Sequence, residues 1–177
     1  MDIRLIDAQH RADIRLPNEP FPLYGSMLPS FRDGVWSWEI RLLPPEQASE
    51  MTFPDEDYDY DAMSGDCFFV GAYEGEACVG LAVWRKEWHK YLYLYDLKVR
   101  REYRGRGIAA RLIDDGKRRA KELGCRGLYT VGQDNNLNAC KLYLRCGFVI
   151  GGYNDHVYNG TSQEGKGDIY FYLEGDG

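Results

Sequence analysis

The sequence is poor in the residues that build metal centres and disulfide frameworks. Only three histidines occur, and His10, His89 and His156 stand far apart without metal-ligand spacing. The five cysteines form an odd set in which no CxxC pair occurs, and the N-terminus shows no signal peptide. A disulfide framework is therefore not expected. These absences predict a cytoplasmic protein that binds no metal.

Long apolar runs and an excess of positive charge are also missing. No segment reaches the roughly 20 apolar residues that a membrane-spanning helix requires. The formal net charge is −6 and the sequence pI is about 5.1, which argues against general nucleic-acid binding. We therefore expect neither a membrane nor a nucleic acid as a partner. Two common phosphate-binding motifs, GxxxxGK(S/T) and GxGxxG with a downstream acidic residue, are absent as well.

What the chain does contain is a regular succession of strand and helix patterns from Cys67 onward. Apolar runs at 67–74 and 77–86, joined at Glu74-Gly75-Glu76, predict a β-hairpin, and a run at 91–99 extends it to an antiparallel meander. The further elements that we expect are a helix from Ile108 closed by Gly124, a strand at 127–131, a helix capped by Asp134 or Asn135 and ended by Gly147, and strands at 148–153 and 168–173. At 177 residues the chain fits one domain of the α/β class, with a mixed, mostly antiparallel sheet on which helices pack.

The first third of the chain has a different character. All seven prolines stand between Pro17 and Pro54, which predicts that no long regular element forms there. The same segment is dense in aromatic residues, among them Trp36 and Trp38. We therefore expect it to pack onto the rest of the domain, either as a lid over the site or as a cover on the sheet. This divides the single domain into an N-terminal arm with acceptor-side elements, 1–66, and a core, 67–177.

A basic turn rich in glycine follows the third strand of the meander directly. It reads Arg104-Gly105-Arg106-Gly107-Ile108-Ala109 and opens the predicted helix. Successive backbone N–H groups and the helix dipole make such a turn a site for an anion. Gly105 and Gly107 let the backbone approach the ligand closely, and Arg104 and Arg106 supply positive charge. The turn predicts a phosphate-binding loop, although a solvated basic turn has the same composition.

A second pattern lies on the second predicted helix. It reads Asn136-x-x-Ala139-x-x-x-Tyr143 and is followed by Cys146-Gly147-Phe148. Ala139 and Tyr143 are four residues apart and so share one face of the helix. Taken singly, the three residues have structural interpretations as a helix cap, core packing and a half-buried tyrosine. Their order after the basic turn, separated from it by a helix and a strand, favours a functional interpretation.

Together the two patterns resemble R-x-x-G-x-A and N-x-x-A-x-x-x-Y-x-x-x-G-F of the GNAT superfamily of N-acetyltransferases. The resemblance implies a GNAT-like fold with splayed central strands and acetyl-CoA as co-substrate, bound by the core 67–177. It places the pyrophosphate on Arg104–Ala109, and the pantetheine arm along the backbone of Leu97, Lys98 and Val99 and against Asn136, Ala139 and Tyr143. The parent thiol of the leaving thiolate has a pKa of about 8.5 and a phenol one of about 10, so Tyr143 would stabilise or protonate the sulfur as it leaves. A backbone N–H near Val99 would stabilise the oxyanion.

A narrower resemblance covers nearly the whole chain, the proline-rich segment included. The stretches PFPLYGSMLPSF, DLKV, REYRGRGIA and QDNNLNACKLYLRCGFVIGG, with Trp36 and Tyr158, resemble streptothricin acetyltransferases. This implies acetylation of a primary amine of a small cationic molecule, such as the β-lysine part of streptothricin, and a role in antibiotic resistance. The chain departs from those enzymes at Tyr95 and Val131, where they carry acidic residues, so the acetyl donor is more firmly implied than the acceptor. The sequence leaves the oligomeric state open, with a homodimer as one possibility.

Asp96 is the candidate proton acceptor. An amine with a pKa near 10 arrives protonated, and Asp96 would receive its proton directly or through water. Alternatively, Asp96 serves only to pair with Lys98 or Arg100. The acidic run Asp55–Asp61 is either a solvated loop, which its composition favours, or part of a site for a cationic acceptor. Three functions remain open: a small-molecule amine acetyltransferase, a protein or peptide N-acetyltransferase, and a non-catalytic acetyl-CoA sensor.

Overall fold

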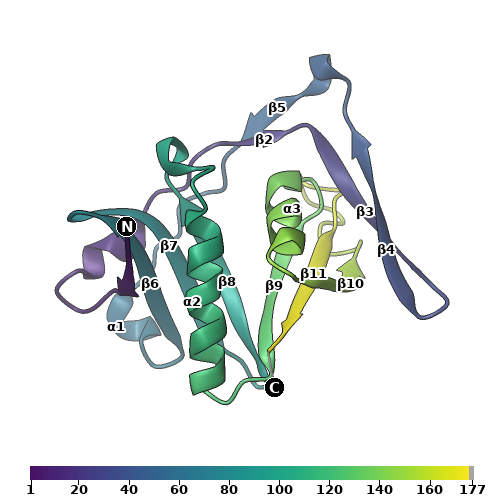
Figure 1. The fold of residues 1–177 in the computed structure, drawn as a ribbon. Coiled ribbons are helices and arrows are strands. Elements are labelled where there is room, and N and C mark those ends of the chain that lie inside the picture. The colour runs from purple at the N-terminus through teal and green to yellow at the C-terminus, as the bar shows by residue number, and fades with distance from the viewer. Residues whose placement is uncertain (176–177) are drawn as a thin grey trace. The chain divides into compact units, whose positions relative to one another are not determined.

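The structure is a computed structural model that describes residues 1–175. The chain forms two compact units (Figure 1). The first unit comprises Met1–Glu19, Thr52–Leu128 and the chain end from Glu174, and the second comprises Pro20–Met51 and Tyr129–Leu173. The single-domain organisation with an arm over 1–66 stays a prediction. Within the described residues, no helix combines the length and the apolar character needed to cross a membrane.

The first unit contains the predicted meander. Its strands β1 (Asp2–Leu5), β6 (Cys67–Glu74), β7 (Ala77–Lys86) and β8 (Tyr91–Val99) pair antiparallel in that order. Gly75 has a φ of 60° in the tight turn that joins β6 to β7, as the Glu-Gly-Glu signal predicts. The hydrophobic alternation and the turn residues of the sequence therefore set this part of the fold.

Helix α2 (Ile108–Glu122) covers one face of this sheet (Figure 1). The apolar side chains that it buries recur at helical spacing, and Gly116 takes the place in that stripe where Trp84 of β7 packs against the helix. A Cβ built at Gly116 would lie 2.1 Å from a ring carbon of Trp84. The opposite face of the sheet is covered by the 3-10 helix η1 (Arg11–Arg15) and the short helix α1 (Tyr60–Met63). The core on that side consists of Ile6, Ile14, Leu16, Tyr58, Cys67, Phe69, Leu81 and Val83.

Strand β8 contains a β-bulge at Tyr95. Trp84 lies opposite Leu94 and Val83 lies opposite Asp96, so that Tyr95 has no partner of its own on β7. One extra residue inverts the side-chain alternation of all the residues that follow it. Leu94 therefore lies on the face that α2 covers, whereas Asp96 and Lys98 lie on the opposite face. The bulge decides on which side of the sheet these two charged groups stand.

The second unit contains four strands from the proline-rich segment. Strands β2 (Phe21–Leu23) and β5 (Ser49–Met51) form one antiparallel pair, and β3 (Gly25–Arg32) and β4 (Val35–Leu42) form another. A short 3-10 helix, η2 (Pro45–Gln47), precedes β5. The prediction that the prolines prevent long regular elements is wrong here, because β3 and β4 have eight residues each. Asp33 and Gly34, with φ values of 51° and 80°, form the two-residue turn between them.

The remainder of the second unit is built on strands β9 (Gly127–Gln133), β11 (Asp168–Glu174) and β10 (Val149–Asn154), which are neighbours in that order. Helix α3 (Leu137–Arg145) packs its buried residues Leu137, Cys140 and Tyr143 into this unit. Its N-cap is Asn136, and the prediction of Asp134 or Asn135 is wrong by one or two residues. Asp134 is occupied elsewhere, since its Oδ2 accepts hydrogen bonds from Tyr153 Oη and from the backbone N–H of Gly167, both at 2.9 Å.

Candidate functional site

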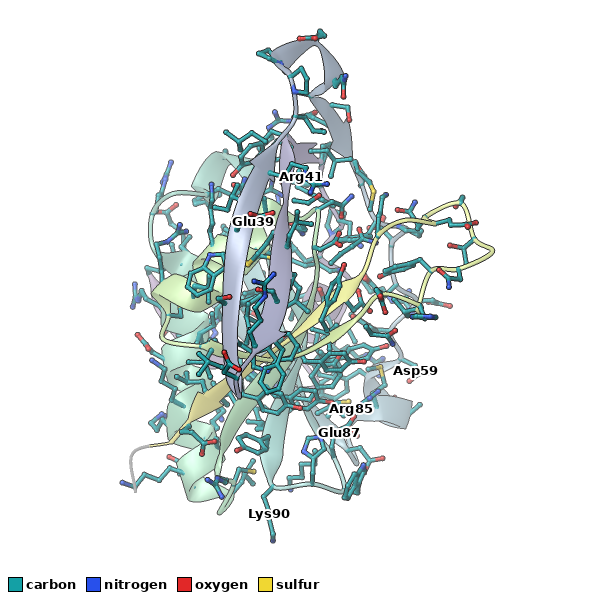
Figure 2. All side chains as sticks on the ribbon, turned by 90° about the vertical axis from the view of Figure 1, so that its right-hand side faces the viewer. Glu39, Arg41, Asp59, Arg85, Glu87 and Lys90 are labelled. Atoms are coloured by element: carbon teal, nitrogen blue, oxygen red, sulfur yellow. The ribbon has the colours of Figure 1, made fainter. Side chains whose placement is uncertain are left out.

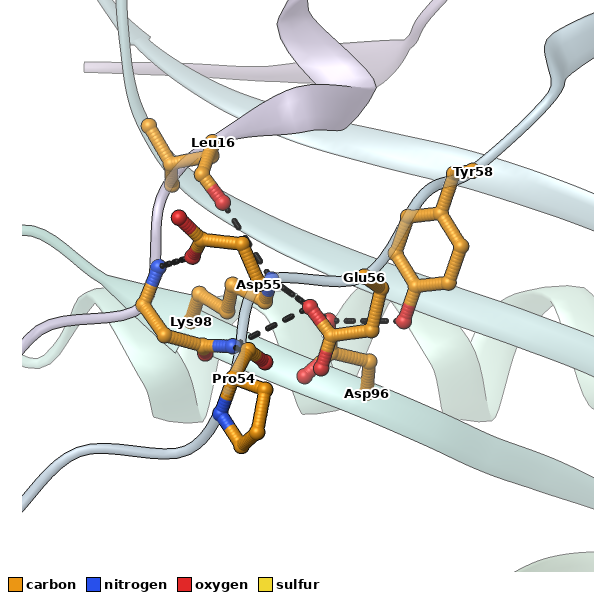
Figure 3. Close-up of polar contacts among 8 residues, drawn as sticks. Leu16, Pro54, Asp55, Glu56, Tyr58, Asp96 and Lys98 are labelled. Carbon is orange, nitrogen blue, oxygen red and sulfur yellow. Dashed lines mark hydrogen bonds and ion pairs between the residues drawn. The ribbon is translucent and has the colours of Figure 1, made fainter.

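Asp96 lies in a buried polar cluster of the first unit, on the sheet face opposite α2 (Figure 3). Tyr58 donates its hydroxyl to Asp96 Oδ2 at 3.0 Å, and Lys98 Nζ lies 3.3 Å from the same oxygen. The ammonium group of Lys98 also donates to the carbonyl of Leu16 at 3.2 Å and to the carboxylate of Glu56. The side chains of Asp96 and Lys98 are only 15% and 7% exposed. The alternative in which Asp96 pairs with Lys98 is thus present in the structure.

The surroundings of Asp96 change its acidity. Burial raises the pKa of Asp96, the positive charge of Lys98 opposes this, and the negative charge of Glu56 raises the pKa further. Burial and the charge of Asp96 also raise the pKa of Tyr58, so its phenol stays protonated and keeps donating its hydrogen bond. A carboxylate with a raised pKa is a stronger proton acceptor than an ordinary one. The assignment of Asp96 as a base stays a prediction.

The acidic run Asp55–Asp61 contributes to this cluster, so its interpretation as a solvated loop is wrong for two of its residues. The side chain of Glu56 reaches Lys98 and that of Tyr58 reaches Asp96, whereas Asp57 lies exposed between them. Asp59 accepts a hydrogen bond from the N–H of Ala62 and caps α1. Sequence reasoning missed Glu56 and Tyr58 as partners of β8 because they lie 42 and 38 residues from Lys98 and Asp96.

The predicted phosphate-binding loop has an open backbone. Gly105 and Gly107 have φ values of 77° and 76°, and a Cβ added at either position would meet no atom within 4 Å. Among residues 1–175, no partner accepts a hydrogen bond from the N–H groups of Gly105, Arg106 or Gly107. Helix α2 begins at Ile108 without a side-chain cap, so its first N–H groups are also available. These observations fit the binding of a multiply charged anion such as a pyrophosphate.

The two arginines of the loop differ in their contacts. Arg104 donates its Nε–H to the carbonyl of Val99 at 3.0 Å, and its guanidinium lies 3.7 Å from the carboxylate of Glu19. Arg106 donates to the carbonyl of Glu102 at 3.0 Å. Arg104 therefore fastens the loop to the end of β8, a positioning role that the sequence did not indicate. The role of both residues as counter-charges for a phosphate stays a prediction.

The second pattern lies on α3 in the second unit. Asn136 Oδ1 accepts a hydrogen bond from the N–H of Ala139 at 3.3 Å, so Asn136 does cap the helix. Tyr143 is buried, and its ring packs against Phe148 and Phe171 at centroid distances of 5.7 and 5.3 Å. The interpretation of Asn136 as a helix cap is therefore confirmed, whereas Tyr143 is more deeply buried than the half-buried tyrosine that we expected. The predicted contacts with a pantetheine arm stay a prediction.

The structure thus brings the predicted site residues together in two groups. Asp96, Leu97, Lys98 and Val99 of β8 and the loop Arg104–Ala109 belong to the first unit, linked by the bond from Arg104 to Val99. Asn136, Ala139 and Tyr143 belong to the second unit, where they lie on one helix. The role of each group in binding acetyl-CoA stays a prediction.

Comparison with known proteins gives one consistent result. The profile of the acetyltransferase (GNAT) family matches residues 33–148. Streptothricin acetyltransferase A of Bacillus subtilis is 29% identical over 162 residues, which are 92% of this chain and 93% of that protein. The crystal structure of a Bacillus anthracis protein assigned as a streptothricin acetyltransferase, in complex with acetyl coenzyme A, is similar with a TM-score of 0.87 at 29% identity, over 99% and 98% of the two chains. Nourseothricin acetyltransferase has the same fold, with a TM-score of 0.80 at 21% identity, over 99% and 98% of the two chains.

Proposed function

Because the chain belongs to the acetyltransferase (GNAT) family and is an acetyl-CoA-dependent acetyltransferase, we propose that it acetylates a primary amine of a small cationic molecule, with streptothricin as the first candidate. The observation that carries this proposal is the Asp96 cluster, in which a buried carboxylate with a raised pKa stands beside a second carboxylate, Glu56. With the ammonium group of Lys98 on both carboxylates, the cluster keeps one net negative charge, which suits an acceptor that arrives as a cation. The likeness to streptothricin acetyltransferases along nearly the whole chain supports the same acceptor class.

Two parts of the chain would hold acetyl-CoA. The N–H groups of Gly105–Ala109 would bind the pyrophosphate, and the α2 dipole would add to the attraction. The backbone of Leu97–Val99 would pair with the pantetheine amides, as an added strand pairs with an edge. Asn136, Ala139 and Tyr143 would line the arm from α3. Acetyl-CoA supplies the activated acetyl group, and the protein supplies its orientation.

Three groups of the chain would carry the chemistry. Asp96 would take the proton from the ammonium group of the acceptor, directly or through water, so that the free amine can attack. Its raised pKa makes this transfer more favourable, and Tyr58 and Lys98 hold the carboxylate in place. The backbone N–H of Val99 would stabilise the oxyanion, and the hydroxyl of Tyr143 would donate a proton to the departing thiolate.

A coupled thiol-release assay tests the proposal. The purified chain is given acetyl-CoA and, separately, streptothricin, lysine, polyamines, aminoglycosides and short peptides. Saturable release of CoA with streptothricin, with a KM in the ordinary range of about 1 μM to 1 mM, is the expected result. Asp96→Asn should lose most of this turnover while it keeps acetyl-CoA binding.

The other outcomes decide between the remaining functions. Turnover on peptides alone would contradict the small-molecule assignment and favour a protein or peptide N-acetyltransferase. Acetyl-CoA binding without release of CoA by any amine would indicate a non-catalytic sensor.

A further inference from the structure

Strand β4 of the second unit presents an unpaired edge, and on the face that it shares with the buried Met27 of β3 its apolar side chains remain partly exposed. It belongs to a two-stranded sheet, and no strand within residues 1–175 pairs with its other edge. Trp38, Ile40 and Leu42 alternate along one face of β4 and are 48%, 41% and 62% exposed. Exposed edges of this length and composition readily pair with another chain. A two-stranded ribbon also has little stability of its own in water.

The register of the hairpin shows which backbone groups of β4 point outward. Arg32 and Val35 flank the two-residue turn, so they form a hydrogen-bonded pair, and alternate pairs along the ladder do the same. Pro29 agrees with this pattern, since it has no N–H to donate and lies opposite Trp38 in a pair without ladder hydrogen bonds. The residues whose N–H and C=O groups point to the free edge are therefore Trp36, Trp38, Ile40 and Leu42.

The polar face of β4 bears two opposite charges at adjacent positions. Glu39 and Arg41 lie on this strand (Figure 2), and their cross-strand neighbours on β3 are Leu28 and Ser26, which carry no charge. Neither residue forms an ion pair with any other residue from 1 to 175. The hairpin thus presents a negative and a positive group, two residues apart, beside an edge that can accept a further strand.

We propose that β4 pairs antiparallel with β4 of a second copy of this chain, about a twofold axis at Ile40. In this register Ile40 faces Ile40 of the partner subunit, Glu39 faces Arg41 of the partner subunit, and Trp38 faces Leu42 of the partner subunit. Each charge pair occurs twice, as a twofold interface requires. The charge pairs fall in the non-hydrogen-bonded positions, where opposing side chains approach most closely.

The charges select this register among those that the backbone allows. An axis at Glu39 or at Arg41 is also compatible with the outward backbone groups, but it would place two Glu39 or two Arg41 side chains opposite each other. An axis at Trp38 would place Glu39 opposite Ser37 and Arg41 opposite Val35, and so leave both charges without a partner. The axis at Ile40 pairs both charges, covers Trp38 and Leu42, and extends the two-stranded ribbon to four strands. The occupant of this edge is therefore a second copy of the chain.

Charge reversal combined with sedimentation equilibrium tests the interface. The unmodified chain is expected to be dimeric. Glu39→Arg and Arg41→Glu each oppose like charges twice per dimer and should raise the Kd of the dimer by about ten- to a hundredfold. The double variant restores opposite charges and should return the Kd to within a fewfold of the original. An equimolar mixture of the two single variants should form the heterodimer, because each chain then carries one sign of charge. Glu46→Arg, an exposed reversal on η2, is the control and should leave the dimer unchanged.

A backbone variant tests the same edge independently of charge. Ile40→Pro removes an outward N–H and leaves the hydrogen bonds to β3 intact, as Pro29 already does on β3. It should abolish the dimer while circular dichroism and acetyl-CoA binding stay unchanged. A monomeric unmodified chain at every concentration overturns the proposal. So does a dimer that survives both single reversals and Ile40→Pro, because its interface would then lie elsewhere.

Discussion

Lys98 Nζ lies 3.3 Å from Asp96 Oδ2, and the two side chains share one face of β8 because they are two residues apart and no bulge lies between them. Lys98 also holds the carboxylate of Glu56. The acidity of Asp96 is thus set by burial, by one positive neighbour and by one negative neighbour. Each of these influences can be changed separately.

The pH dependence of catalysis should respond to the two charged neighbours in opposite directions. Asp96 must be ionised to accept a proton, so kcat/KM should rise with pH through its raised pKa, above the ordinary value of about 3.9. Glu56→Gln removes a negative charge, lowers the pKa of Asp96 and should move this limb to lower pH. Lys98→Met removes a positive charge and should move it to higher pH. Asp57→Asn, at the exposed neighbouring position, is the control and should not move it.

The same pKa shift affects stability. Because the folded-state pKa of Asp96 is raised, its contribution favours the folded state at low pH and is lost as pH rises through that pKa. Asp96→Asn should therefore flatten the pH dependence of thermal unfolding in this window. If kcat/KM rises over the same pH range in Glu56→Gln and in Lys98→Met as in the unmodified chain, Asp96 is not the proton acceptor.

Gly107→Ala should weaken acetyl-CoA binding. Gly107 has a φ of 76°, and the left-handed conformation costs a residue with a Cβ about 1–2 kcal/mol. The Cβ would also fill the open space beside the unpaired N–H groups. We expect the Kd for acetyl-CoA, measured by calorimetry, to rise about tenfold or more. Gly124→Ala, at the other end of α2, is the control. Gly124 has a φ of 69° and equally open surroundings, so the variant introduces the same backbone strain away from the predicted binding loop. Equal losses of binding in the two variants would show that strain alone is responsible.

Tyr143→Phe should separate catalysis from binding. The ring packs against Phe148 and Phe171, and phenylalanine preserves this packing. Loss of a general acid typically lowers kcat by about 10²- to 10⁴-fold, while the Kd for acetyl-CoA should stay nearly constant. Tyr24→Phe is the control, since it removes two hydrogen bonds to other residues of α3, the one donated to Asn138 at 2.7 Å and the one accepted from Lys141 at 3.3 Å. Unchanged turnover in Tyr143→Phe would exclude its role as the acid.

Gly116→Ala should destabilise the first unit, although alanine is the better helix former. The higher helix propensity of alanine stabilises the folded state by about 1 kcal/mol, whereas overpacking of a core typically destabilises it by about 1–3 kcal/mol or more. The added Cβ would lie 2.1 Å from the Trp84 ring, so either the helix or the indole must move. We expect a lower free energy of unfolding in urea titration. Lys117→Ala, one residue along, should leave stability nearly unchanged, and a stabilised Gly116→Ala would contradict this packing.

The sequence by itself determined the elements that depend on local patterns. Alternating apolar runs and the turn at Gly75 predict the meander, helical spacing and Gly124 predict α2, and the two glycines of the basic turn predict an open loop. These features depend on the periodicity of the apolar residues and on the conformational freedom of glycine. Both are recognised from residues that lie close together in the sequence. The Asp33-Gly34 turn was visible in the same way, but the prolines around it led to the wrong prediction. Pro29 is tolerated because its nitrogen faces away from the partner strand.

Only the tertiary structure decided the surroundings of Asp96. The extra residue at Tyr95 turns Asp96 away from α2, and no local pattern marks it, because a bulge is defined by pairing with another strand. Glu56 and Tyr58 reach β8 from about forty residues away, and they carry the groups that bond Lys98 and Asp96. An acidity that depends on burial and on distant charges is set when the chain folds, since neither exists in the extended sequence.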